Sequence, residues 1–140
     1  MVPIDFQPVG RDAIKFAYHL FPNAEFELLY VADLWYAQKM RHYAMKYNRE
    51  KTLRKEMRME LLNKMKQFAS QCDVDTSRMK LTLQGGYPAS VINDYANKHK
   101  FDLVVMGARG QPQIQYILLG SVAKKILQII TKDVLVVPSK

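Results

Sequence analysis

Residues 101–137 read FDLVVMGARGQPQIQYILLGSVAKKILQIITKDVLVV, and the fold class can be argued outward from them. The apolar runs Phe101–Met106 and Val134–Val137 are short and continuous, which is typical of strands buried on both faces. Between them, Ser121–Ile130 has helical spacing and follows a loop that contains glycines. Two buried strands joined through a helix predict a parallel β-α-β unit with a right-handed crossover.

The rest of the chain repeats this alternation of strand and helix. Three further strands are predicted at Val2–Ile4, Phe26–Val31 and Met79–Gln84. Further helices are predicted at Arg11–Leu20, along the apolar stripe of Leu53, Met57, Leu61, Met65 and Phe68, and from Pro88 onward. We therefore predict one α/β domain over residues 1–140, an open, doubly wound sandwich whose five parallel strands have the order 3-2-1-4-5.

Composition excludes several classes of protein. Hydrophobic residues at 49% and charged residues at 24% are ordinary globular values over 140 residues, so disordered, collagenous and membrane classes are excluded. The start of the chain lacks the pattern of a signal peptide, and the lone Cys72 cannot form an internal disulfide. We therefore expect a cytoplasmic protein without a membrane partner.

The positive charge is concentrated in one segment. The formal net charge is +8, and residues 39–66 carry +7 of it, with ten Lys or Arg against three Glu. Such a segment is usually a solvated helix face. The alternative is a non-nucleotide interaction module that docks this helix on nucleic acid or an acidic protein. Nucleic acid is the less favoured partner, because the chain lacks a recognition-helix or RNA-binding signature.

Ligands of doubly wound sheets bind beyond the carboxyl ends of the strands. Asp5 follows the first predicted strand there, and Gly107-Ala108-Arg109-Gly110 follows the fourth. Nine residues later, Gly120-Ser121-Val122 leads into the last helix. Glycines allow the backbone to approach an anion, and the free N–H groups of a helix N-terminus favour phosphate. Alternatively, the glycines serve only as turns, and Asp5 is a turn or N-cap residue.

These motifs resemble the universal stress protein (UspA-like) family. Its nucleotide-binding subgroup shows G-x2-G-x9-G-[ST], which Gly107, Gly110, Gly120 and Ser121 match without a gap. VPIDF at the start and ILLGSVAKKILQ with VLVVP near the end are also similar to the family pattern. The family often carries Ser two residues after its aspartate, where this chain has Gln7.

The resemblance implies an adenine nucleotide alpha hydrolase-like fold with ATP in a cleft. Pro3, Ile4, Asp5 and Val31 would frame adenine, while Met106 and Gly107 would lie against the ribose. Phosphate contacts would come from the following residues: Arg109, Gly110, Gly120, Ser121 and Val122. A Mg²⁺ or Mn²⁺ ion would be held through the phosphates.

The same resemblance implies a nucleotide-sensing regulatory module in the stress response. No lysine stands where a P-loop would need one, so whether the protein is an enzyme stays open, with slow ATP hydrolysis as the limit. His19, His42 and His99 lack the spacing of metal ligands, and Cys72 has no local partners for nucleophilic chemistry. Family members commonly dimerise through the last strand, here Val134, Leu135, Val136 and Val137.

Overall fold

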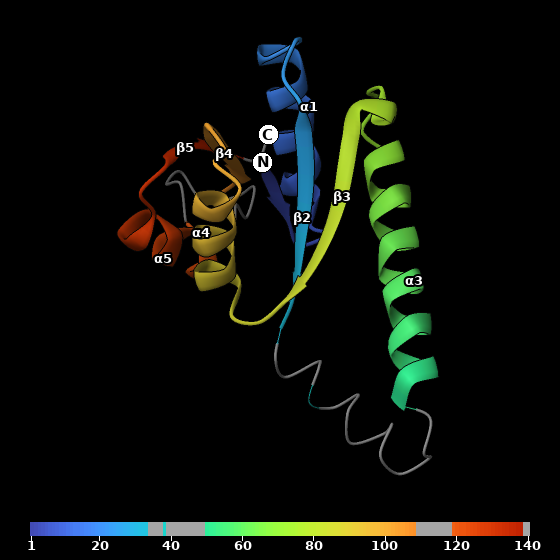
Figure 1. The fold of residues 1–140 in the computed structure, drawn as a ribbon. Coiled ribbons are helices and arrows are strands. Elements are labelled where there is room, and N and C mark those ends of the chain that lie inside the picture. Colours follow the sequence, from blue (N-terminus) through green and yellow to red (C-terminus); the bar gives the residue numbers. More distant parts are fainter. Residues whose placement is uncertain (34–37, 39–49, 109–118, 139–140) are drawn as a thin grey trace.

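The computed structural model of the chain describes residues 1–33, 38, 50–108 and 119–138. Strands and helices alternate along it (Figure 1). The elements are β1 (Val2–Ile4), α1 (Pro8–Leu20), β2 (Phe26–Ala32), α3 (Glu50–Ser70), a 3-10 turn (Thr76–Arg78), β3 (Met79–Gly85), α4 (Pro88–Lys98), β4 (Leu103–Gly107), α5 (Ser121–Ile129) and β5 (Asp133–Val137). The predicted alternation is confirmed, and the less regular first half of the long 34–70 stretch lies mostly outside the described residues.

The boundaries differ from the predicted ones by a few residues. The largest difference is at α1, which begins at Pro8 rather than Arg11. Proline suits the first turn of a helix because its missing N–H would have no intrahelical partner there. Gln7 is the N-cap residue of this helix, where a shorter Ser side chain would be a strong capping group.

The strands are parallel and form two sheets. β2 lies between β1 and β3 in a three-stranded sheet, and β4 pairs with β5. Backbone hydrogen bonds of 2.9 Å join the sheets, from the Met1 nitrogen to the Leu103 oxygen and from the Val105 nitrogen to the Met1 oxygen. The next residue on that edge of β1 is Pro3, which has no N–H to donate. The α/β class is confirmed, whereas one continuous five-stranded sheet is not.

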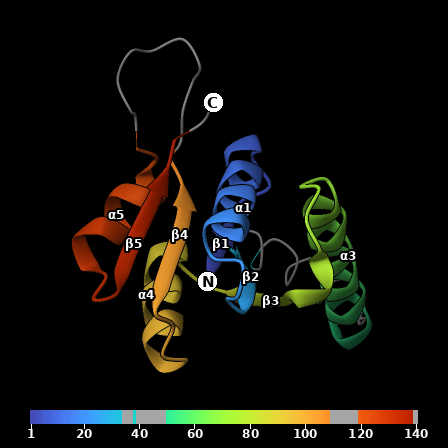
Figure 2. The ribbon, with the colours of Figure 1, turned by 90° about the horizontal axis from the view of Figure 1, so that it is seen from above.

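Helices cover both faces of the strands (Figures 1 and 2). On one face, Ile14 of α1 and Met65 of α3 are buried with Leu28 of β2. On the other, Ile92 of α4 and Ile126 of α5 are buried with Leu29 of the same strand. Neighbouring residues of one strand thus serve opposite cores, as the two-residue period of a strand requires.

Among the described residues, no helix combines the length and apolarity that are needed to cross a bilayer.

Candidate functional site

Asp5 lies at the carboxyl end of β1, where the chain turns into α1. Its side chain is exposed, and its Oδ1 accepts a hydrogen bond of 3.1 Å from the Gln7 N–H. This is the turn role that the sequence left open for Asp5. A carboxylate can accept several hydrogen bonds, so Asp5 can still accept one from a ligand while it holds the turn.

Gly107, the first glycine of the motif, packs against the first turn of α1. A Cβ added there would lie 2.9 Å from the Val9 carbonyl oxygen and 2.8 Å from Val9 Cγ2. The close approach of α1 to β4 therefore requires a glycine at this position. Gly10 is the next residue of the helix after Val9. A Cβ added at Gly10 would lie 3.9 Å from Asp5 Oδ1. The start of α1 thus lies against both Asp5 and Gly107.

The N-terminus of α5 belongs to the same carboxyl edge, because α5 starts the return from β4 to β5. Gly120 is its N-cap, and the Gly120 carbonyl accepts the Lys124 N–H at 2.9 Å. The N–H groups of a first helical turn have no intrahelical acceptor, and the side chains of Ser121 and Val122 are exposed. This end of the helix can therefore donate to an anion.

The apolar residues predicted to frame the ligand lie in the two cores. Ile4 belongs to the core beneath α1 and α3, whereas Val31 and Met106 belong to the core beneath α4 and α5. Pro3 is buried as well. Val31 follows Tyr30, the register partner of Ile4, so it stands opposite Asp5. Arg109 and Gly110 lie outside the described residues.

Phe6 is a residue near this edge that the sequence analysis missed. Its φ is +63°, the left-handed region, and its ring contacts Tyr30 of β2 and Phe68 of α3. No sequence pattern distinguishes a phenylalanine that adopts this backbone conformation. The contacts that hold it come from residues far away in the chain.

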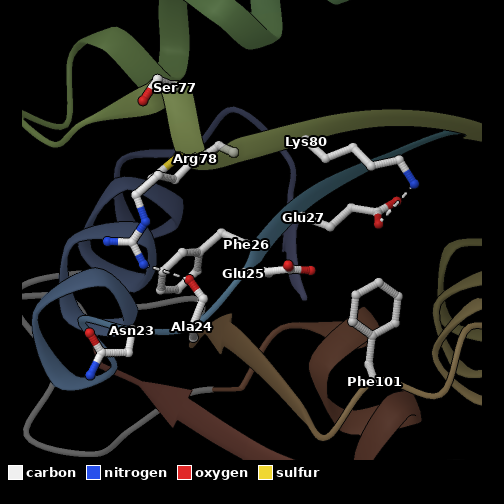
Figure 3. A pocket seen from close by; sticks show the side chains of 10 residues that line it. Asn23, Ala24, Glu25, Phe26, Glu27, Ser77, Arg78, Lys80 and Phe101 are labelled. Atoms are coloured by element: carbon white, nitrogen blue, oxygen red, sulfur yellow. Dashed lines mark hydrogen bonds and ion pairs between the residues drawn. The ribbon is translucent and has the colours of Figure 1, made fainter.

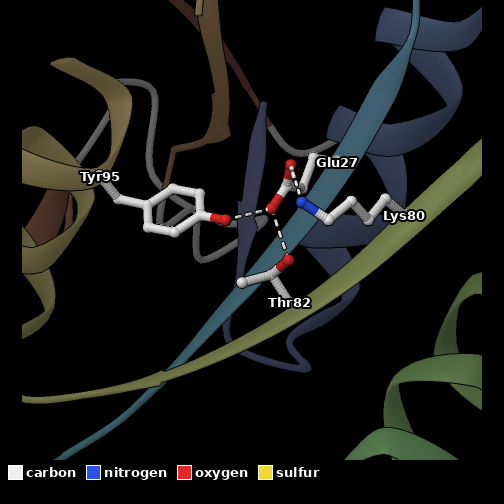
Figure 4. A network of polar contacts seen from close by, with 4 residues as sticks. All are labelled: Glu27, Lys80, Thr82 and Tyr95. Atoms are coloured by element: carbon white, nitrogen blue, oxygen red, sulfur yellow. Dashed lines mark hydrogen bonds and ion pairs between the residues drawn. The ribbon is translucent and has the colours of Figure 1, made fainter. Parts of the chain in front are cut away.

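Glu27 is a second residue that was missed. It is buried in β2, where its Oε1 accepts hydrogen bonds from Tyr95 Oη at 2.6 Å and from Thr82 Oγ1 (Figure 4). Its Oε2 lies 3.2 Å from Nζ of Lys80. An acidic residue inside the apolar run FELLYV was the available signal, because a buried carboxylate needs donors.

The polar partners control the protonation of this group. Burial by itself raises the pKa of Glu27, but the hydrogen bonds from Thr82, Tyr95 and Lys80 outweigh it and hold that pKa below its ordinary value. Burial and the hydrogen bond to Glu27 raise the pKa of Tyr95, which stays a donor. The cluster fastens α4 to β2 and β3.

Two hollows formed by described residues lie away from the carboxyl edge. One, of about 550 Å³, is at the amino ends of β2 and β3 (Figure 3). Its two cations are engaged, Arg78 with the Ala24 carbonyl at 2.8 Å and Lys80 with Glu27. The other, of about 680 Å³, is lined by residues of α3, the 3-10 turn and β3. We assign neither to the nucleotide, because parallel sheets bind ligands at the opposite end.

A resident metal site would need several ligands that converge. In the part of the chain that the structure describes, no three His, Cys, Asp or Glu side chains are grouped so as to hold an ion.

Comparison with known proteins identifies the family. The model of the universal stress protein family matches residues 1–138. The chain belongs to the universal stress protein family. It is 32% identical over 139 residues to universal stress protein MJ0531 of Methanocaldococcus jannaschii, a match that covers 98% of this chain and 79% of the relative.

Solved structures share the universal stress protein fold. Protein MJ0577 of Methanocaldococcus jannaschii superimposes with a TM-score of 0.70 at 26% identity, over 99% of this chain and 95% of that one. A universal stress protein in complex with cAMP superimposes with a TM-score of 0.60 at 21% identity, over 97% and 92% of the two chains.

Proposed function

We propose that this universal stress protein binds ATP at the carboxyl edge of its strands. The observation that supports it best is the juxtaposition of Asp5 and Gly107 around the start of α1, with the N-terminus of α5 on the same edge. A hydrogen-bond acceptor for adenine or ribose and backbone donors for phosphate are what an adenine nucleotide needs at its two ends.

Each predicted residue has a place in this proposal. Asp5 accepts a hydrogen bond from the adenine or the ribose, and Pro3, Ile4, Val31, Met106 and Gly107 form the wall behind it. The phosphates receive hydrogen bonds from backbone N–H groups and the Ser121 hydroxyl, at Gly110, Gly120, Ser121 and Val122. Arg109 adds a charge-assisted contact. A Mg²⁺ or Mn²⁺ ion would be held through the phosphates, which would supply oxygen ligands.

Two further observations support this site. A universal stress protein of the same fold was solved in complex with cAMP, an adenine nucleotide, which supports a nucleotide site here. The hydrogen bonds between Met1 and β4 support the strand order 3-2-1-4-5, in which β1 and β4 are neighbours. The strand order reverses between these two strands, and a ligand-binding crevice forms at such a point.

We propose a regulatory rather than a rapid catalytic role in the cytoplasm. The glycine motif is not followed at once by the lysine that P-loop enzymes use to neutralise transferred phosphate. Binding that is not coupled to fast turnover suits a protein that reports the nucleotide level during stress. Slow hydrolysis is compatible with this role.

Calorimetry with ATP tests the proposal. Gly120→Val places a side chain in the phosphate path, yet Gly120 has φ −62° and ψ 162°, which valine adopts readily. We expect ATP affinity to fall by at least about tenfold while the fold persists. Gly85→Ala is the control, because an added Cβ there meets only the Ala32 oxygen, at 4.0 Å. Equal ATP affinity in wild type and Gly120→Val would contradict the proposal.

A further inference from the structure

The backbone of Phe6 is unusual among the described residues. Three of them other than glycine have a left-handed φ: Phe6, Asp73 and Lys100. Aspartate tolerates this region, and Lys100 ends α4 with a hydrogen bond from its N–H to the Asn97 oxygen. Phe6 is bulky and stands between a strand and a helix. Such a conformation persists where the surroundings hold it in place, and it clusters at functional sites.

The Phe6 ring is contacted by residues of α3 and of β2. The Phe6 ring lies 5.7 Å from the Phe68 ring, centroid to centroid, in an edge-on arrangement. Nζ of Lys64 stands 4.4 Å from the Phe6 ring centroid, within the range of a cation–π interaction. Tyr30 of β2 packs on the ring as well, at 4.6 Å.

These contacts are coupled to Asp5 through the chain and through space. Asp5 directly precedes Phe6, so the φ of Phe6 sets the direction in which the chain leaves Asp5. Gly10 lies between Phe68 and Asp5: a Cβ added at Gly10 would be 3.3 Å from the Phe68 ring and 3.9 Å from Asp5 Oδ1. Phe68 and Asp5 therefore both lie beside the backbone of α1 at Gly10.

We infer that Phe6 is a positioning residue for the nucleotide site, clamped by Phe68 and Lys64, so that α3 sets the affinity for adenine nucleotides. This inference rests on the proposed function, in which Asp5 contacts adenine or ribose. The clamp favours the backbone conformation that can bind. Weakening it lowers the fraction of competent molecules, and apparent affinity falls by that fraction.

Two matched lysine variants test the clamp. Lys64→Gln removes the cation from the Phe6 ring, and we expect ATP affinity to fall measurably, by at most about fivefold, the upper limit for an exposed cation–π contact. Lys66→Gln removes the same charge from another exposed position of α3, and it should bind ATP as the wild type does. Phe6→Leu should weaken ATP binding more than Lys64→Gln does. Phe6→Tyr keeps the aromatic ring and should bind ATP as the wild type does.

Adenosine separates positioning from a direct effect of charge. It has no phosphate, so a positioning role weakens adenosine and ATP binding by the same factor, whereas a direct charge effect weakens ATP alone. Equal loss for both ligands supports the clamp. Loss for ATP alone, or wild-type affinity in Lys64→Gln and Phe6→Leu, overturns it. If Phe6→Leu does not fold, the surface variant Lys64→Gln decides. A wild type that binds neither ligand overturns the proposed function itself.

Discussion

At the residue scale, Glu27 shows how a buried carboxylate joins separate elements. It pairs with Lys80 across the β2–β3 register and receives the hydroxyl of Tyr95 from α4. The Lys80 side chain is 65% exposed, so solvent screens much of this ion pair. The hydroxyl donors Thr82 and Tyr95 therefore contribute more to holding Glu27 ionised within the fold.

The pH dependence of stability tests this cluster through Tyr95→Phe. Because the folded-state pKa of Glu27 is lowered, its ionised form adds stability above the ordinary glutamate pKa of about 4.3, and this stability is lost as pH falls through the folded-state pKa. The variant removes one donor, so we expect it to be about 1–2 kcal/mol less stable at pH 7. The difference should shrink at more acidic pH.

Urea denaturation at pH 7 and at lower pH values measures this difference. Tyr87→Phe is the control, since Tyr87 is 68% exposed and loses a hydroxyl at the surface. A Tyr95→Phe deficit that stays constant over the whole acidic range in which both proteins fold would show that Glu27 does not carry the effect.

The residue scale is also where prediction from sequence was most uneven. Asp5 could be selected because it follows a strand at the edge where ligands bind. Phe6 could not, because its left-handed backbone depends on Phe68 and Lys64, which are remote in the sequence. Candidate site residues that are set by their neighbours in the chain can be predicted, whereas those set by tertiary contacts cannot.

At the element scale, hydrophobic periodicity located the strands and helices well. Buried strands such as β2 and β4 were recognisable as short apolar runs, and α4 from its first-turn proline. The pairing of strands was harder to predict, because the absence of a single N–H donor can end a ladder of hydrogen bonds. Pro3 is part of the apolar strand β1 as predicted, but it has no N–H to donate toward β4, and the described strands form two sheets.

Packing of α1 on β4 gives a prediction at this scale. Gly107→Ala places a methyl group 2.9 Å from the Val9 carbonyl, and backbone can relieve this contact only if α1 moves away from β4. We expect a loss of about 1–3 kcal/mol in the free energy of unfolding. Gly85→Ala, at the end of β3, has room for the methyl group and should change stability little. Equal effects of the two substitutions in urea denaturation would disprove the packing role.

At the scale of the whole molecule, charge distribution carries less information than the glycine motif. Lys55 and Arg58 are exposed on α3, as expected of a solvated face. Lys64 of the same helix is also exposed, but its Nζ contacts the Phe6 ring, so not every lysine of α3 is only solvated. The net charge of +8 could not distinguish such a lysine from its neighbours, because charge counts contain no information about contacts.

Assembly gives the last prediction, which concerns the edge of β5. Ala108 donates to the Val137 oxygen at 2.7 Å, so Val137 faces β4, and the alternate residues Val134 and Val136 direct their backbone groups to the other edge. No described strand pairs with that edge. An apolar edge with unpaired N–H and C=O groups favours pairing with another chain. We propose that two copies pair there about a two-fold axis. Each copy then uses the same edge, so assembly stops at the dimer.

Val136→Pro removes one donor from the outer edge of β5 and leaves the β4 ladder intact, since the Val136 N–H does not face β4. Light scattering should find a dimer for the wild type and a folded monomer for this variant. Leu135→Pro is the matched comparison, because Leu135 faces β4 and its loss of a donor should instead lower stability. Val137 is unsuited to the test, since it is 6% exposed and already belongs to the core of one copy. A wild type that is monomeric at high micromolar concentration would disprove the dimer, and a Val136→Pro variant that still dimerises would place the interface elsewhere.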